Sequence, residues 1–263
     1  MTFDYPLAFN AIKFMAIIAR MGAFMSAFPI FNSGNIPAKY KVFFVMFIGI
    51  LLIPVVPSDW VSSEFFRNLD LLKLTFMMVS EILLGLTISI FVLCIIEIFQ
   101  FGGFIIDRGM GFVMAQIMDP GTGASSTPIS NLLVQGFYLM FLISDGHHEV
   151  LRLAAYSFQS IPPGSFLLTP NIAETAIALT SQIFVVGLQI AFPVFAAMFF
   201  VNLAMGLLAR VGEDFPVLML SFPIRFGLGF IILIGTFPII ISICRKMNQE
   251  MLEWIAFLVR FEF

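Results

Sequence analysis

The sequence predicts an all-α membrane protein. Of its 263 residues, 60% are hydrophobic and 11% are charged, whereas soluble proteins average about 25% charged residues. Long apolar stretches recur, without the repeated alternation of polar and apolar side chains that transmembrane barrels show. Charges, prolines and paired glycines interrupt these stretches, and such groups are costly against lipid. We therefore expect helices whose polar and kinked faces are received by neighbouring subunits of an assembly.

The apolar stretches define the candidate helices. They lie at about 7–31, 42–57, 74–98, 101–118, 129–144, 147–160, 175–209 and 217–244. The first contains Lys13 and Arg20, each costing about 2.5–3.5 kcal/mol near the bilayer centre. Because its apolar residues roughly balance that cost, this segment inserts poorly unless Arg20 finds a partner. Pro54 and Pro57 end the second stretch.

The third stretch places a charge and two small residues on one helix face. Glu81, Gly85 and Ser89 are spaced by four residues each. Small residues at this spacing let two helices approach closely, so we expect this face to pack against another helix. The polar residues of 58–73 before it are typical of a solvated connector.

The stretch from Gln100 to Thr127 is rich in glycine and methionine. Its glycines are Gly102, Gly103, Gly109, Gly111, Gly121 and Gly123, and its apolar side chains include Met110, Phe112, Met114, Ile117 and Met118. Adjacent Asp107 and Arg108 either neutralise one another or reach separate partners. Asp119-Pro120-Gly121 predicts a turn. Two interpretations remain open: an ordinary inter-helix connection, or a loop whose apolar side chains seal a passage.

The last two stretches predict long helices. Residues 175–209 contain no charge, and one helix of this length would measure about 52 Å, with a kink or a break at Pro193. Asn202, Gly206 and Arg210 share one face near its end. A short tail follows the final stretch; it should pack on a partner or lie at the membrane interface, with fraying as the alternative. Its apolar face comprises Met247, Met251, Ile255 and Leu258.

The sequence offers little support for catalysis. His147, His148 and Glu149 form the only metal-like group, but adjacent histidines project to different sides of a helix. We therefore favour a structural role near a helix start, and we predict no catalytic residue, no metal site and no cofactor. Cys94 and Cys244 lie in apolar stretches and are expected to be inert.

The charged residues argue against one further class of function and leave another as an alternative. The net charge of −3 and the absence of a basic run argue against nucleic-acid binding. A proton-coupled secondary transporter remains an alternative, because Glu81, Glu97 and Asp107 could carry protons inside a membrane. No convincing internal repeat supports it.

The order and spacing of several landmarks resemble the FliR/SctT family, the export-gate subunits of flagellar and virulence type III secretion systems. The resemblance covers essentially the whole chain. The landmarks are Arg20, Pro29, Ile36-Pro37, Lys39, Lys41, Glu81, Gly85, Gln100, Gly103, Ile106-Asp107, Gly111, Asp119-Pro120, Asp145-Gly146-His147-His148, Ser157-Phe158, Pro162, Gly164, Pro193, Asn202, Gly206 and Arg210.

This resemblance implies a fusion of two partner types. Residues 1–165 would be similar to FliP, and residues 166–263 would be a FliQ-like helical hairpin with the C-terminal tail. One copy would join FliP-like and FliQ-like subunits and an FlhB-like switch subunit in the bacterial inner membrane, within the flagellar basal body. The gate would pass unfolded secreted proteins. A virulence (injectisome) system is the alternative to a flagellar one.

The resemblance also implies a plug. Residues of about 109–126 would obstruct the channel at rest, and the glycines would let them move when substrate arrives. The predicted plug residues are Gly109, Met110, Gly111, Phe112, Met114, Gln116, Ile117, Met118, Asp119, Pro120 and Gly121. The predicted packing residues, between helices or between subunits, are Arg20, Glu81, Gly85, Asp107, Arg108, Asn202, Gly206 and Arg210.

Overall fold

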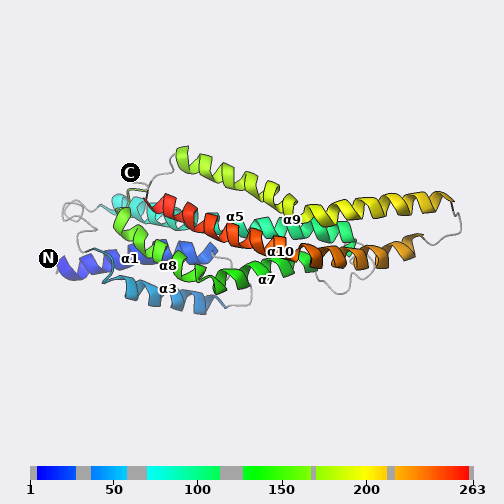
Figure 1. Ribbon diagram of the computed structural model, residues 1–263. Helices are drawn as coiled ribbons and strands as arrows, with labels where there is room; N and C mark the ends of the chain where they lie inside the picture. The colour runs from blue at the N-terminus through cyan, green and yellow to red at the C-terminus, as the bar shows by residue number, and fades with distance from the viewer. Residues whose placement is uncertain are drawn as a thin grey trace. The chain divides into compact units, whose positions relative to one another are not determined.

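In the computed structural model, each regular element among the described residues is an α-helix, as the sequence predicts. The described residues are 5–27, 37–57, 70–112, 127–166, 170–211 and 217–260. In chain order the helices are α1 (Tyr5–Ala27), α3 (Ala38–Leu52), α5 (Leu71–Met110), α7 (Pro128–Ile143), α8 (Gly146–Ser160), α9 (Pro170–Val211) and α10 (Val217–Arg260) (Figure 1).

Local sequence explains several helix ends. Helix α3 ends at Leu52, just before Pro54, as expected for a residue that lacks the N–H of the next helical hydrogen bond. Pro128 is the first residue of α7, where that N–H is not needed. Asp145 separates α7 from α8 because it has a left-handed conformation, with φ of 55°.

Helix α5 corrects the prediction of two separate stretches at 74–98 and 101–118. It runs without interruption from Leu71 to Met110, through Gly102 and Gly103. Each glycine costs a helix interior about 1 kcal/mol. That cost is offset here because both glycines are buried where another helix comes very close.

The two C-terminal helices are also longer than predicted. Helix α9 runs through Pro193 as one long helix, which agrees with the first of the two predicted alternatives and excludes the break. Helix α10 includes the predicted tail as a direct continuation. The tail's predicted apolar face is correct, but it is buried within this chain, and no other subunit is needed to cover it. Its members are Met247, Met251, Ile255 and Leu258.

Length and composition identify the helices that could cross a membrane. Among the described residues three qualify, α5, α9 and α10, and α7 with α8 would make a fourth if the pair counts as one span. Helix α5 has 40 residues and is therefore about 60 Å long at 1.5 Å per residue. A span needs about 30 Å, so much of this helix extends beyond what a single crossing requires.

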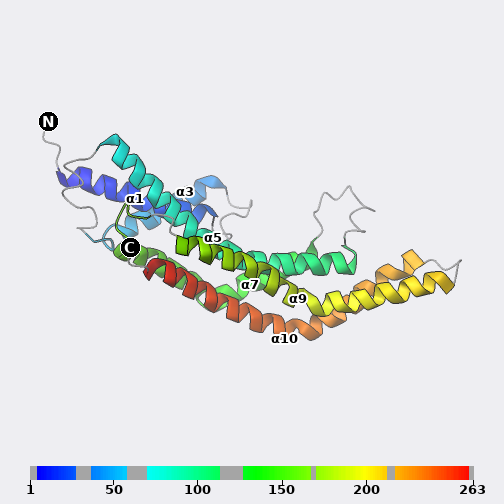
Figure 2. The ribbon, with the colours of Figure 1, turned by 90° about the horizontal axis from the view of Figure 1, so that it is seen from above.

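The chain divides into two compact units. The first comprises 1–93, 145–177 and 249–263, and the second comprises 94–144 and 178–248. In the first unit α1 and α3 lie side by side (Figures 1 and 2), where Gly49 admits Ile18 and Phe14. The predicted boundary at residue 165 separates two regions that resemble different partner proteins. It does not predict where the compact units begin and end.

Candidate functional site

Each compact unit contains a buried cluster of side chains at a helix contact, held by polar groups. In the first unit we call Arg20, Glu81, Ser157, Phe158 and Ile161 the Arg20 cluster. In the second unit we call Asp107, Ile129, Ser130, Gln100 and Gly103 the Asp107 clamp. Both clusters contain residues that the sequence predicts to act in packing.

The Arg20 cluster joins α1, α5 and α8. The Arg20 Nε donates to Glu81 Oε2 at 2.5 Å, and each of the two side chains is 1% exposed. The guanidinium also donates to Ser157 Oγ at 3.1 Å and to the Ile161 carbonyl at 3.4 Å. It lies 4.3 Å from the Phe158 ring centroid, which adds a cation–π attraction.

Glu81 uses its second oxygen to hold the segment after α8. Oε1 accepts the Gly164 N–H at 3.2 Å, and Gly164 has a positive φ of 76° that favours glycine. Because both carboxylate oxygens and most of the guanidinium are bonded, the buried pair has the additional partners that such pairs require. The cluster therefore fixes three elements that are distant in sequence.

The predicted face of α5 contacts α1 directly. A Cβ atom on Gly85 would overlap the Arg20 carbonyl and lie 2.9 Å from the Ala23 Cβ. One turn further, Ser89 Oγ donates to the Phe24 carbonyl at 2.9 Å. Glu81, Gly85 and Ser89 thus make one continuous contact between α5 and α1.

The Asp107 clamp joins the end of α5 to the start of α7. Asp107 Oδ1 accepts the Ile129 N–H and Oδ2 accepts the Ser130 N–H, each at 3.0 Å. These donors are among the first N–H groups of α7, which have no partner within their own helix. A carboxylate is also favoured at the positive end of the helix dipole.

Close backbone packing completes the clamp. Ser130 Oγ donates to the Gln100 carbonyl at 2.8 Å. A Cβ on Gly103 would overlap the Ser130 backbone, so α5 and α7 touch at a point where α5 has no room for a side chain. The neighbouring Gly102 faces Gly187 of α9 in the same way, because a Cβ there would lie 2.9 Å from the Gly187 carbonyl.

These contacts correct one expectation drawn from the sequence. Arg20, Glu81 and Asp107 are satisfied inside this chain and do not need a neighbouring subunit. Asp107 and the adjacent Arg108 reach separate partners, since Arg108 is exposed and lies 4.5 Å from the Phe104 ring centroid. The same holds for Lys13, whose Nζ donates to the Val56 carbonyl at 2.5 Å.

The structure describes the first four of the predicted plug residues. Met110 ends α5 and is fully buried, and a Cβ on Gly229 of α10 would lie 2.7 Å from its Cε. Gly111 has a φ of 87°. The rings of Phe112 and Phe226 pack edge to face, with their centroids 5.3 Å apart. Gly109 precedes them in α5. The other predicted plug residues lie in 113–126, outside the described residues: Met114, Gln116, Ile117, Met118, Asp119, Pro120 and Gly121.

The remaining predicted packing residues lie on an open face of α9. Asn202, Gly206 and Arg210 are all exposed. A Cβ on Gly206 would have no atom within 4 Å. This face is therefore available for a contact that the chain does not make with itself.

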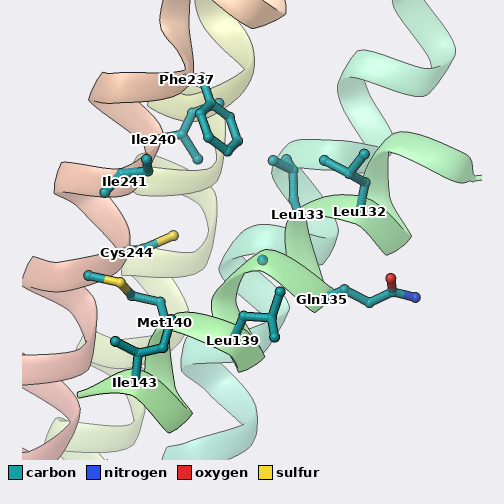
Figure 3. A pocket seen from close by; sticks show the side chains of 11 residues that line it. Leu132, Leu133, Gln135, Leu139, Met140, Ile143, Phe237, Ile240, Ile241 and Cys244 are labelled. Carbon is teal, nitrogen blue, oxygen red and sulfur yellow. The ribbon is translucent and has the colours of Figure 1, made fainter.

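An apolar groove lies between α7 and α10 in the second unit (Figure 3). It encloses about 530 Å³, and the amide of Gln135 points away from the α10 side chains. None of its lining residues is charged, so it offers a packing surface and no acid or base. They are Leu132, Leu133, Gln135, Gly136, Leu139, Met140, Ile143, Phe237, Ile240, Ile241 and Cys244.

The histidine pair lies at the start of α8. Possible ligand atoms of Asp145, His147 and His148 lie within 4.8 Å of one another. However, Asp145 and His148 already pair at 3.2 Å and are both largely exposed, and a cation is unfavourable at the positive end of a helix. The arrangement fits a surface turn that begins the helix.

Sequence reasoning missed the partners of the two clusters. Ser130 and Gly187 carry no motif of their own, and Ser157 enters only as a landmark of the family resemblance, although each supplies a close contact. The paired glycines at 102 and 103 were the available signal, because two small residues side by side can admit two neighbouring helices.

Together, long apolar helices with buried polar contacts define an integral-membrane helical protein without a recognisable reaction site among the described residues. Residues 11–251 match the family model described as "Bacterial export proteins, family 1". The chain belongs to this family, which confirms the predicted FliR/SctT resemblance. Its predicted function as a subunit of a type III export gate stands with that membership.

Individual relatives agree with the family match. The chain is 29% identical over 246 residues to the flagellar biosynthetic protein FliR of Bacillus subtilis (strain 168), covering 91% of this chain and 92% of that protein. It is 25% identical over 239 residues to FliR of Escherichia coli (strain K12), covering 91% and 89%. The Yop proteins translocation protein T of Yersinia pestis is 25% identical over 178 residues, covering 66% and 67%.

Proposed function

We propose that this chain is the single-copy gating subunit of a flagellar protein export gate in the bacterial inner membrane. In this proposal, residues 109–126 obstruct the conduit at rest and move aside for an unfolded substrate. The chain performs no chemistry on the substrate. Coverage of nearly the full length of flagellar relatives favours a flagellar over a virulence system, since the virulence relative matches a shorter part.

The observation that carries the gating proposal is the anchoring of this segment at both ends. On its N-terminal side, Met110 is buried and Phe112 packs on Phe226. On its C-terminal side, the start of α7 is bonded to Asp107. A loop whose two ends are held on one rigid scaffold can block a passage and still change conformation between its anchors.

Exposed apolar helix faces support the proposed partners. Phe192 and Phe200 of α9 are 66% and 70% exposed, and Phe43 of α3 is 71% exposed. Apolar faces of this kind on long helices mark contacts with lipid or with other proteins. We assign the open faces to FliP-like, FliQ-like and FlhB-like subunits, with residues 1–165 being FliP-like and residues 166–263 FliQ-like.

Deletion of residues 111–121 tests the gating proposal. The deletion should increase the leak of small solutes through the assembled gate, because the apolar obstruction is removed while both clusters remain. Complexes would be purified in mild detergent, their mass measured to confirm assembly with one copy of this chain, and the leak measured after reconstitution into vesicles. Replacing the same residues by a Gly/Ser segment of equal length separates loss of the apolar side chains from loss of chain length.

Two results would contradict the proposal. An assembled deletion variant with the parent's permeability would remove the plug from residues 109–126. A chain that purifies as a monomer and moves a solute by itself would favour the transporter alternative.

A further inference from the structure

The apolar groove between α7 and α10 ends at a pair of polar side chains. Its lining comes from both helices (Figure 3). On α10 the lining residues recur every three or four positions from Phe237 to Cys244, and Asn248 is the next residue on that stripe. On α7 the lining extends to Ile143, which Ser144 follows. Asn248 Nδ2 donates to Ser144 Oγ at 2.8 Å, so the two polar side chains meet where the apolar lining stops.

The side-chain oxygen of Asn248 is a buried acceptor without a donor. Asn248 is 5% exposed, and within the described part of the chain its Oδ1 has no hydrogen-bond partner. Ser144 determines which way the amide points, because its one hydroxyl hydrogen is donated to the Phe141 carbonyl at 3.2 Å. Toward Asn248 that hydroxyl can therefore only accept. The NH₂ group of Asn248 must face Ser144, and Oδ1 needs a donor that the described residues do not supply.

We infer that this groove binds one acyl chain of a phospholipid, whose headgroup lies at Asn248. The groove encloses about 530 Å³, within the range of about 300–1,000 Å³ that is typical of ligand pockets. Its α7 wall, from Leu132 to Ile143, is about 17 Å long at 1.5 Å per residue, and none of the lining residues is charged. An elongated apolar groove that ends in a buried acceptor fits an amphiphile, with an alkyl chain along the groove and an N–H or O–H donor at its polar end.

The charges at this end select the kind of headgroup. Arg245 precedes Asn248 by three residues on α10, so the two are neighbours on the helix surface, and Arg245 is exposed. Its guanidinium can pair with a lipid phosphate, while Asn248 Oδ1 accepts a hydrogen bond from an ammonium group attached beyond that phosphate. Phosphatidylethanolamine carries both groups. Apolar side chains of another protein would fill the groove but leave Oδ1 unpaired.

The groove is open to a lipid chain from the bilayer. Helix α10 is one of the helices long and apolar enough to cross a membrane. On the α7 side of the groove, Leu139 and Ile143 are 62% and 78% exposed. Gly136 also lines the groove and leaves it unfilled, since a Cβ there would have no atom within 4 Å. This binding site goes beyond the proposed function and does not depend on gating.

A photoactivatable lipid tests the site. The chain would be purified with its complex in mild detergent and reconstituted into vesicles that contain phosphatidylethanolamine with a diazirine on one acyl chain. After irradiation, mass spectrometry of the digested chain should show lipid adducts on residues 132–143 and 237–244. Gly136→Phe should remove most of these adducts, because the new ring fills the groove. Gly235→Phe is the matched control: Gly235 is also an open helical position, on α10, and does not line the groove.

A second comparison tests the polar end. Phosphatidylcholine has the phosphate but no N–H or O–H donor in its headgroup. With the same diazirine chain it should label the groove about tenfold less than phosphatidylethanolamine, the difference expected for one hydrogen bond from a charged donor. Asn248→Leu removes the acceptor and should make the two lipids label the groove equally. The comparison in the parent needs no substitution, so it is independent of any effect of a variant on folding.

Three results would contradict the inference. Adducts elsewhere on the chain but none on the lining residues would overturn the site, and this is the result expected if a segment of a partner subunit fills the groove. Adducts that are as abundant in Gly136→Phe as in the parent would overturn it as well, because the labelled lipid would then belong to the general lipid surroundings. Equal labelling of the parent by the two headgroups would overturn the contact at Asn248.

Discussion

Neutralising Glu81 should destabilise the first compact unit strongly. Glu81→Gln keeps the volume of the side chain but removes the charge that faces Arg20 at 2.5 Å. Arg20, which is 1% exposed, would then retain Ser157 Oγ and the Ile161 carbonyl at 3.1 and 3.4 Å. Both are neutral acceptors, so the buried positive charge would lose the carboxylate that faces it.

The expected magnitude follows from burial. Breaking a buried ion pair by removing one partner costs about 3–5 kcal/mol, whereas an exposed pair contributes about 0–1 kcal/mol. Native proteins have a total stability of about 5–15 kcal/mol, so the loss is a large share of it. Glu81→Gln should therefore lower the midpoint of thermal unfolding in detergent and reduce the yield of assembled complex.

Replacing both members of the pair separates the effect of the ion pair from general disturbance of the helix contact. Arg20→Met together with Glu81→Met removes both charges, and this pair should recover much of the stability lost by Glu81→Gln. Glu97→Gln is the matched control, because Glu97 is exposed on the same helix. If Glu81→Gln and Glu97→Gln unfold at the same temperature, the Arg20–Glu81 pair is incidental and this argument is refuted.

Two glycine substitutions test helix packing inside and outside the chain. Gly103→Ala should destabilise the contact between α5 and α7 by about 1–3 kcal/mol, measured by thermal unfolding, because its Cβ would overlap the backbone of Ser130. Gly136→Ala is the control, since no atom lies within 4 Å of its Cβ, and an equal loss there would contradict the packing argument. Gly206→Leu should leave the isolated chain as stable as the parent but lower the recovery of the complex, because Gly206 is exposed; normal recovery would show that this face of α9 contacts no partner subunit.

The helices could be predicted largely from the sequence, and the misassigned end of α5 has a physical cause. Residues 100–110 look like a flexible connection because glycines and charges follow one another there. In the structure they are the last turns of α5, since Gly102 and Gly103 are matched by close neighbours. In the local sequence a glycine is simply unfavourable for a helix. The contact that compensates for this cost is made by residues distant in the chain, so the local sequence does not show it.

In the candidate site, too, the sequence predicts which residues need a partner but not which residue that partner is. The spacing of Glu81, Gly85 and Ser89 predicts a packed face, and Arg20 predicts the need for a counter-ion. The sequence did not indicate that each is the partner of the other. We expected other subunits to satisfy these charges, and the structure places the partners within the same chain.

Sequence by itself determined the helical membrane class and, through the order of its landmarks, the family of bacterial export proteins. Both depend on composition and on spacing along the chain, which are local properties. The tertiary structure alone decided which buried charges meet, and that Asp107 joins the two helix ends around residues 113–126. Such pairings depend on three-dimensional proximity between segments, because a buried carboxylate is stabilised by whichever donors the fold brings within hydrogen-bonding distance.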